Sequence, residues 1–266
     1  MSFLRNLFRN DPPARPVAAK SEPSRPAVDV SSAGQPIDCA GVEWNIQEQL
    51  RFLRGPVAAS RDRLATLLHS DIFRDDPQCT DADAAVIFAI LAQHEPTRMM
   101  QVGAGCMTLA FAHAKQTLHL PGELIAIEPK SPADVSEFVD ALLRKPVITV
   151  PVEDFAMLQS GELLFVDSSR RLAPGSDSQY LIETILPALN EGVLVGFNGI
   201  RLPFEYNADE LRRGYSEQAA LLKFLQSRPS EILFAGSYLR ANYAEESQKN
   251  LPGGETTQLW FRLGAP

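Results

Sequence analysis

Two glycines separated by one residue mark the first point in the chain where residue type and spacing indicate chemistry. A short apolar run at 98–102 ends in Gln101-Val102, Gly103-Ala104-Gly105 follows, and a helical pattern then continues through Ala114. Glycine lets a ligand approach the backbone closely where a strand turns into a helix. The exposed amides at a helix N-terminus favour an anionic group. The run therefore predicts a ligand-binding turn, although an ordinary tight turn has the same pattern.

An acidic residue at the end of the next apolar run strengthens this prediction. The run ELIAIE at 123–128 ends in Glu128, 23 residues after Gly105 (128 − 105). A carboxylate at that strand end can accept hydrogen bonds from both hydroxyls of a ribose. A glycine turn followed by an acidic strand end indicates a cofactor that contains a nucleoside.

The residues after the turn narrow the kind of nucleoside. A dinucleotide fingerprint has a third small residue where this chain has Thr108, and no Gly-Lys-Ser or Gly-Lys-Thr run follows. The third small residue lets the helix pack tightly beside a pyrophosphate. A nicotinamide dinucleotide is therefore disfavoured, whereas S-adenosylmethionine has no phosphate and does not need that position.

The elements that must position these residues alternate between apolar runs and helical patterns. A helix is expected at 43–72, broken at Gly55-Pro56, and further helices at 81–93, 134–144, 177–189 and 217–226. Strands are expected at 98–102, 123–128, 147–150, 162–167, 192–197, 232–238 and 257–263. Alternation with mostly unbroken apolar strands predicts a parallel sheet covered on both faces. No helical crossover is expected between the last two strands, which can pair antiparallel at the edge.

Several short motifs in the second half carry a resemblance to a known family. They are Asp167-Ser168-Ser169, Gly175-Ser176-Asp177, Leu186-Pro187-Ala188-Leu189, and Ile200 with the run Leu202-Pro203-Phe204-Glu205-Tyr206. Because these motifs occur in this order, residues 81–263 resemble a bacterial branch of the class I S-adenosylmethionine-dependent methyltransferases. The resemblance implies an α/β, Rossmann-like class I methyltransferase fold with a seven-stranded, mostly parallel sheet and helices on both faces.

The resemblance also implies a cofactor site for S-adenosyl-L-methionine. Gly103, Ala104 and Gly105 would lie against its methionine part, Glu128 would bind its ribose, and Glu153 or Asp154 would lie near its adenine. We name Gly103, Ala104, Gly105, Glu128 and Asp154 as the cofactor-binding candidates.

The chain departs from that branch where acid–base chemistry is expected. It has Arg170 where the branch has His after Asp-Ser-Ser, and Asn198-Gly199 where the branch has His-Asp. Asp167, Arg170 and Asn198 are then the catalytic candidates, with Arg170 either paired to Asp167 or clamping an anionic substrate. One Asp with one Asn is a poor cation site, so no metal is expected. His69, His94, His113 and His119 all precede the second strand, and none is expected to be a base.

These observations support two functions of different classes. The first is metal-independent methyl transfer from S-adenosylmethionine to a small-molecule or carbohydrate-like acceptor, which can proceed by proximity and orientation. The alternative is a non-catalytic cofactor-binding or interaction protein on a methyltransferase scaffold. The net charge of −8 argues against nucleic acid as a partner.

The first 38 residues differ in composition from the rest of the chain. They contain six of the 20 prolines, so we expect residues 1–38 to be disordered. Residues 2–10 form either a short amphipathic helix that docks weakly on a membrane surface or partner, or a frayed terminus. A helical addition at 39–95 and the cofactor-binding domain at 96–266 should follow. Three scattered cysteines predict neither a zinc site nor a disulfide framework, and they suit the reducing cytoplasm.

Overall fold

The computed structural model describes residues 31–64, 67, 79–130, 135–253 and 255–265. Its centre is a seven-stranded sheet of order β3-β2-β1-β4-β5-β7-β6. The strands are β1 (Arg98–Val102), β2 (Glu123–Ile127), β3 (Ala141–Leu143), β4 (Leu163–Val166), β5 (Leu194–Phe197), β6 (Ser230–Ala235) and β7 (Leu259–Leu263). Only β7 is antiparallel to its neighbours, β5 and β6. The predicted mostly parallel, Rossmann-like α/β sheet is confirmed.

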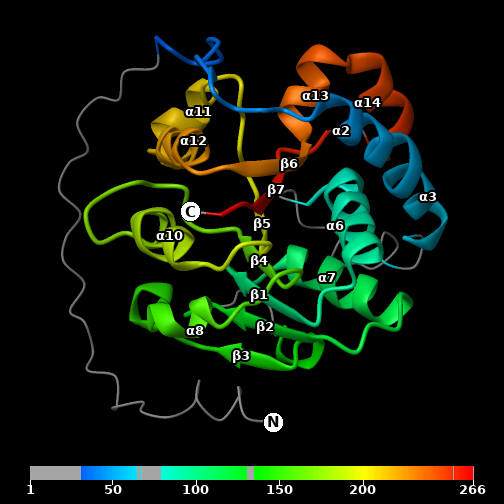
Figure 1. The fold of residues 1–266 in the computed structure, drawn as a ribbon, viewed down its shortest axis with the longest axis vertical. Helices are drawn as coiled ribbons and strands as arrows, with labels where there is room; N and C mark the ends of the chain where they lie inside the picture. The colour runs from blue at the N-terminus through cyan, green and yellow to red at the C-terminus, as the bar shows by residue number, and fades with distance from the viewer. Residues whose placement is uncertain (1–30, 65–66, 68–78, 131–134, 254, 266) are drawn as a thin grey trace.

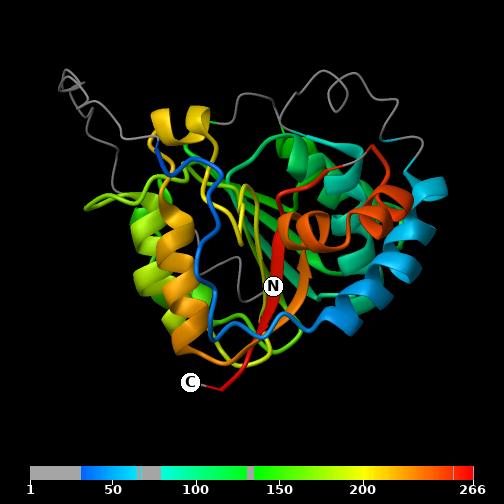
Figure 2. The same ribbon diagram turned by 90° about the horizontal axis from the view of Figure 1, so that it is seen from above.

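Helices cover both faces of this sheet (Figures 1 and 2). One face carries α2 (Ile46–Phe52), α3 (Ala58–Ser60), α6 (Asp81–His94), α7 (Cys106–Thr117), α13 (Gly236–Asn242) and α14 (Ala244–Asn250). The other carries α8 (Val152–Ala156), α10 (Leu186–Ala188) and α12 (Glu217–Ser227). The short helices α9 (Asp177–Gln179) and α11 (Ala208–Arg212) lie in the segments that follow β4 and β5.

Alternation along the strands explains why both faces need a cover. Met99 and Leu163 belong to the core beneath α6 and α7, whereas their neighbours Met100 and Leu164 belong to the opposite core. Successive side chains of a strand point to opposite faces. A strand that is apolar at every position is therefore stable only between two helical layers.

The N-terminal helices share one core with the sheet. Leu53, the first residue after α2, lies in the same apolar cluster as Phe234 of β6. Gln49 Oε1 of α2 accepts a 2.8 Å hydrogen bond from the backbone of Ala235. The break predicted at Gly55-Pro56 is wrong. The helix passes through this point as a π-helical segment, Leu53–Val57, because a wider turn can accommodate a proline that lacks an amide proton.

The region between β2 and β4 differs most from the prediction. Ala141–Leu143 is a strand, within the helix expected at 134–144, and Val147–Thr149 is a 3-10 helix where a strand was expected. Asp140 exchanges two hydrogen bonds with Leu124, of 2.7 and 2.9 Å, which aligns the following residues beside β2. Of the 147–150 run, only Val147 and Val150 are buried, which fits a tight helical turn rather than a strand.

The last two strands are connected differently from the expectation. The strand predicted at 232–238 ends at Ala235, and α13 and α14 follow before β7. The prediction that no helix connects the last two strands is therefore wrong. The predicted antiparallel pairing of β6 and β7 is confirmed.

Residues 34–37, within the segment expected to be disordered, are attached to the loop after β5. Gly34 donates to the backbone of Tyr206, Ile37 donates to Pro203, and Pro36 forms an isolated bridge with Phe204. The body of the protein therefore begins before the boundary expected at residue 38. The amphipathic segment 2–10 lies outside the described residues.

One cysteine pair is bonded, contrary to the expectation from spacing. Cys79 and Cys106 form a disulfide with a Cα–Cα distance of 6.2 Å, and Cys39 is free. The packing of α6 against α7 brings together two residues that are 27 positions apart. Among the described residues, no helix is long and apolar enough to span a bilayer.

Candidate functional site

The candidate residues meet at the carboxyl ends of four adjacent strands. The hydrogen-bond ladder continues past the strand ends, since Gly103 donates to Ile127, Asp167 to Val102, and Asn198 to Val166. These bonds fix the glycine turn, the Asp-Ser-Ser run and the residue after β5 beside one another. Ligands of open α/β sheets bind at this edge.

Two cavities share this edge. One, of about 460 Å³, is lined by Gly103, Glu128 and Asp167, with apolar walls from Ile127, Val147 and Ile148. The other, of about 530 Å³, extends past the glycine turn. They share Gly103, Glu128, Asp167, Ser168 and Ser169. A larger cavity of about 1100 Å³ lies at the opposite edge of the sheet and contains none of the candidate residues.

The glycine turn is positioned by a close backbone contact. Gly103 has φ +87°, and a Cβ there would overlap the carbonyl oxygen of Asp167. Gly105 donates its amide to Thr108 Oγ1 at 3.1 Å and accepts from the Thr108 amide at 3.0 Å. Thr108 therefore caps the turn from its own helix, which explains why a third small residue is absent.

The structure brings four of the five cofactor candidates together. Gly103, Ala104, Gly105 and Glu128 all line the second cavity, and Glu128 Oε1 accepts a 2.8 Å hydrogen bond from the amide of Lys130. Asp154 lies on α8, and neither it nor Glu153 lines these cavities. Val147 and Ile148 line the first cavity instead, in the segment where the secondary structure was predicted wrongly.

The three catalytic candidates form one hydrogen-bonded group. Asp167 Oδ1 accepts from Arg170 Nη2 at 2.8 Å and from Asn198 Nδ2 at 3.2 Å. Of the two alternatives for Arg170, the ion pair with Asp167 is observed. A Cβ at Gly199, where φ is +83°, would overlap Arg170 Nε, so glycine at this position leaves room for the Arg170 side chain. The Asp167 carboxylate raises the pKa of Arg170, although burial acts to lower it.

A buried carboxylate behind this group was not among the sequence candidates. Glu217 is 1% exposed, and its Oε2 accepts from Ser178 Oγ at 2.8 Å and from Ser168 Oγ at 3.5 Å. Its Oε1 has no partner among the described residues. Burial raises the pKa of Glu217 to about 7. Ser168, which lines both cavities, therefore connects the cavities to a carboxyl group that titrates near neutrality.

A signal for Glu217 was present in the sequence. Leu221 and Leu225 on α12 are buried, and Glu217 precedes them at the same four-residue spacing. Residues at this spacing share a helix face. The spacing therefore places the Glu217 carboxylate on the apolar face of the helix, toward the core. Buried carboxylates of this kind concentrate at functional sites.

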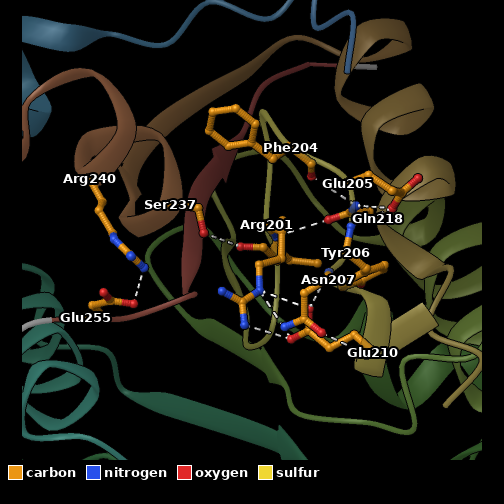
Figure 3. Close-up of polar contacts among 11 residues, drawn as sticks. Arg201, Phe204, Glu205, Tyr206, Asn207, Glu210, Gln218, Ser237, Arg240 and Glu255 are labelled. Atoms are coloured by element: carbon orange, nitrogen blue, oxygen red, sulfur yellow. Dashed lines mark hydrogen bonds and ion pairs between the residues drawn. The ribbon is translucent and has the colours of Figure 1, made fainter. Parts of the chain in front are cut away.

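Polar contacts hold the loop after β5 to side chains of α11 and α12 (Figure 3). Gln218 accepts from the amide of Arg201 at 3.0 Å and donates to Glu205 at 2.8 Å, while Arg201 pairs with Glu210 of α11 at 2.8 Å. Glu205 also accepts from the amide of Tyr206 at 2.7 Å. These contacts give Glu205 a role in loop packing.

The three histidines that the structure describes do not contribute to this edge. His94, His113 and His119 line neither cavity, and His69 lies outside the described residues. Burial lowers the pKa of His94 to about 4. No group of three or more metal-ligating side chains occurs in the part of the chain that the structure describes.

Comparisons with known proteins give similarity at the level of structure only. No protein-family model and no curated protein sequence matches this chain. An SAH-bound methyltransferase from Podospora anserina aligns over 78% of this chain and 96% of its own, with 16% identity and a TM-score of 0.44. An O-methyltransferase from Streptomyces achromogenes, in complex with SAM, aligns over 84% and 97%, with 12% identity and a TM-score of 0.43.

A branched-chain polyamine synthase from Thermus thermophilus has a similar fold. It aligns over 80% of this chain and 65% of its own length, with 15% identity and a TM-score of 0.45. The sheet itself defines the fold: its strand order and single antiparallel strand are those of the Rossmann-like class I methyltransferase fold.

Proposed function

We propose that this protein binds S-adenosylmethionine at the carboxyl edge of the sheet and transfers its methyl group to a small-molecule acceptor without a metal. The observation that carries this proposal is the pair of joined cavities, because one cradle presents a glycine turn, a strand-end carboxylate and an apolar wall. Glu128 would bind the ribose, Val147 and Ile148 would contact the adenine, and Gly103 to Gly105 would border the methionine part.

The residues of the chain supply orientation and a route for the proton. When bound, S-adenosylmethionine would supply a methyl group on a sulfonium, and the leaving group of the transfer would be the neutral thioether S-adenosylhomocysteine. The acceptor must then lose one proton. Ser168 lies between the cavities and Glu217, and the ionised Glu217 can take that proton through Ser168. Such contacts are often long in unliganded structures and shorten in the reacting complex.

Arg170 and Asn198 have a different role from a base. Both bind the same oxygen of Asp167, so they hold Asp167 in place as a wall of the cavities. The alternative, a non-catalytic scaffold, is favoured by one observation: Arg170 and Gly199 are fitted to one another where the family resemblance implies His and Asp.

Replacing Glu128 by Ala tests the cofactor assignment. Two hydrogen bonds from ribose hydroxyls to a carboxylate would be lost, at a cost on the order of 2–4 kcal/mol in binding free energy. Calorimetry with S-adenosylmethionine, its demethylated product and NAD in parallel measures this. Glu123→Ala, at the opposite end of β2, is the matched control and should bind as the wild type does. No binding by the wild type at millimolar cofactor, or equal binding by Glu128→Ala, contradicts the assignment.

Chelation tests the metal-independence of the reaction. Asn198 and Gly199 leave too few hard oxygen ligands beside Asp167 for a stable divalent cation site. Methyl transfer should therefore proceed unchanged after dialysis against EDTA, measured as release of S-adenosylhomocysteine. Loss of turnover on chelation, with recovery on adding Mg²⁺ or Mn²⁺, is the contrary result.

A further inference from the structure

The second cavity has a charge opposite to that of the chain. It is lined by four cationic side chains, Lys130, Arg170, Arg171 and Arg213, and by two carboxylates, Glu128 and Asp167. The chain as a whole carries a net charge of −8. A cationic cavity on an acidic protein is a local feature, and it attracts anions.

The cations of this cavity differ in their partners. Arg170 is paired with Asp167, whereas Lys130 contacts Glu128 through its backbone amide alone. Among the described residues, no ion pair engages Arg171 or Arg213, and both side chains are exposed. The adjacent Arg212, by contrast, pairs with Asp209. Arg171 and Arg213 are therefore available to a ligand.

Hydrogen bonds between two loops hold these arginines at the same cavity. The amide of Ser216 donates to the carbonyl of Arg170 at 2.9 Å, and the amide of Leu172 donates to Ser216 Oγ at 3.0 Å. Gly214 has φ +83°, and a Cβ there would lie 3.8 Å from Arg171 Cδ. The stem of Arg171 thus runs across the loop that carries Arg213, which brings two guanidinium-bearing residues to one wall.

We propose that Arg171 and Arg213 form an anion subsite, so that the methyl acceptor is a small molecule carrying a carboxylate or phosphate group. Guanidinium groups bind both anions through paired N–H donors. The inference rests on the proposed function for the location of the methyl donor. A sulfonium at this edge adds further positive charge, and an anionic acceptor compensates for it. Tyr215, which also lines the cavity and lies under Arg170, supplies an aromatic wall beside the subsite.

Phosphate binding tests the subsite without any knowledge of the acceptor. Inorganic phosphate is titrated into the full-length protein by calorimetry, with and without saturating S-adenosylhomocysteine. The wild type should bind phosphate in both conditions, more weakly as ionic strength rises. Arg171→Gln with Arg213→Gln should weaken phosphate binding about tenfold or more, as loss of two charge-assisted contacts implies. Arg212→Gln should bind phosphate as the wild type does, and S-adenosylhomocysteine affinity should be unchanged in every variant.

Three results would overturn the proposal. The first two are no phosphate binding by the wild type and equal phosphate binding by the double variant. The third is a loss of S-adenosylhomocysteine affinity in the double variant, together with competition between phosphate and S-adenosylhomocysteine for the wild type. The last result would assign the arginines to the cofactor's own carboxylate. Failure of S-adenosylhomocysteine to bind the wild type, with phosphate binding intact, would instead remove the proposed function and leave the anion subsite standing.

Discussion

Replacing Glu217 by Gln is expected to lower kcat about 100-fold at pH 7, near the lower limit of what a general base contributes. The wild-type rate should rise with pH through about 7, because the buried carboxyl group must lose its own proton before it can take one from Ser168. The variant should show a low rate with no such rise. The measurement is release of S-adenosylhomocysteine between pH 5.5 and 9 with a panel of hydroxylated carboxylic acids and phosphates.

The same variant should become more stable while it becomes less active. The pKa of Glu217 is raised from 4.5 to about 7 in the folded chain, so the folded state holds a proton that the unfolded state releases between these values. Retention of this proton stabilises the folded state fully below pH 4.5, and that stabilisation is lost as the pH rises to about 7. Glu217→Gln removes this loss, and its free energy of unfolding at pH 8 should exceed the wild-type value by on the order of 3 kcal/mol.

Opposite changes in rate and stability separate a proton-handling role from a structural one. Glu183→Gln, at an exposed position, should alter neither quantity. Urea unfolding at pH 5 and pH 8 measures the stability difference and needs no acceptor. A wild-type pH–rate profile retained in Glu217→Gln would remove Glu217 from the reaction. A variant less stable than the wild type at pH 8 would show that the ionised carboxylate supports the fold.

Replacing Gly103 by Ala is expected to weaken cofactor binding strongly and to destabilise the fold. The added methyl would overlap the carbonyl oxygen of Asp167, and the backbone at φ +87° is one that side chains rarely adopt. Both are backbone constraints, so rotation of a side chain cannot relieve them. We expect a loss of about 2–4 kcal/mol in stability, typical of strain at a special backbone conformation, and at least a 100-fold loss of affinity for S-adenosylhomocysteine.

Gly105 provides a matched control within the same turn. A Cβ there meets no atom within 4 Å, and its φ of −176° is open to any residue. Gly105→Ala should therefore melt within a degree or two of the wild type, as neutral surface changes do. Equal melting temperatures for Gly103→Ala and the wild type would mean that the strand ends can separate to admit a side chain.

The sheet and its ligand-binding edge could be predicted from the sequence because they depend on local patterns. The apolar runs at 98–102, 123–128 and 162–167 are long enough to indicate buried strands, and parallel strands place their carboxyl ends at one edge. That geometry brings Gly103, Glu128 and Asp167 together without any knowledge of side-chain packing. The wall that Val147 and Ile148 give the first cavity was less predictable. A strand was expected at 147–150, whereas this segment begins with a 3-10 helix in which Val147 is buried and Ile148 is exposed.

The contact between Glu217 and Ser168 was decided by tertiary structure. Glu217 and Ser168 are 49 residues apart, and only the packing of α12 against the end of β4 brings them into contact. The pKa of Glu217 depends on burial, which is a property of the folded core and of no residue alone. Tertiary structure likewise places Arg171 and Arg213 at one cavity, through the hydrogen bond of Leu172 to Ser216. It also joins Cys79 to Cys106. Sequence determined which strands end together, and packing determined which side chains meet there.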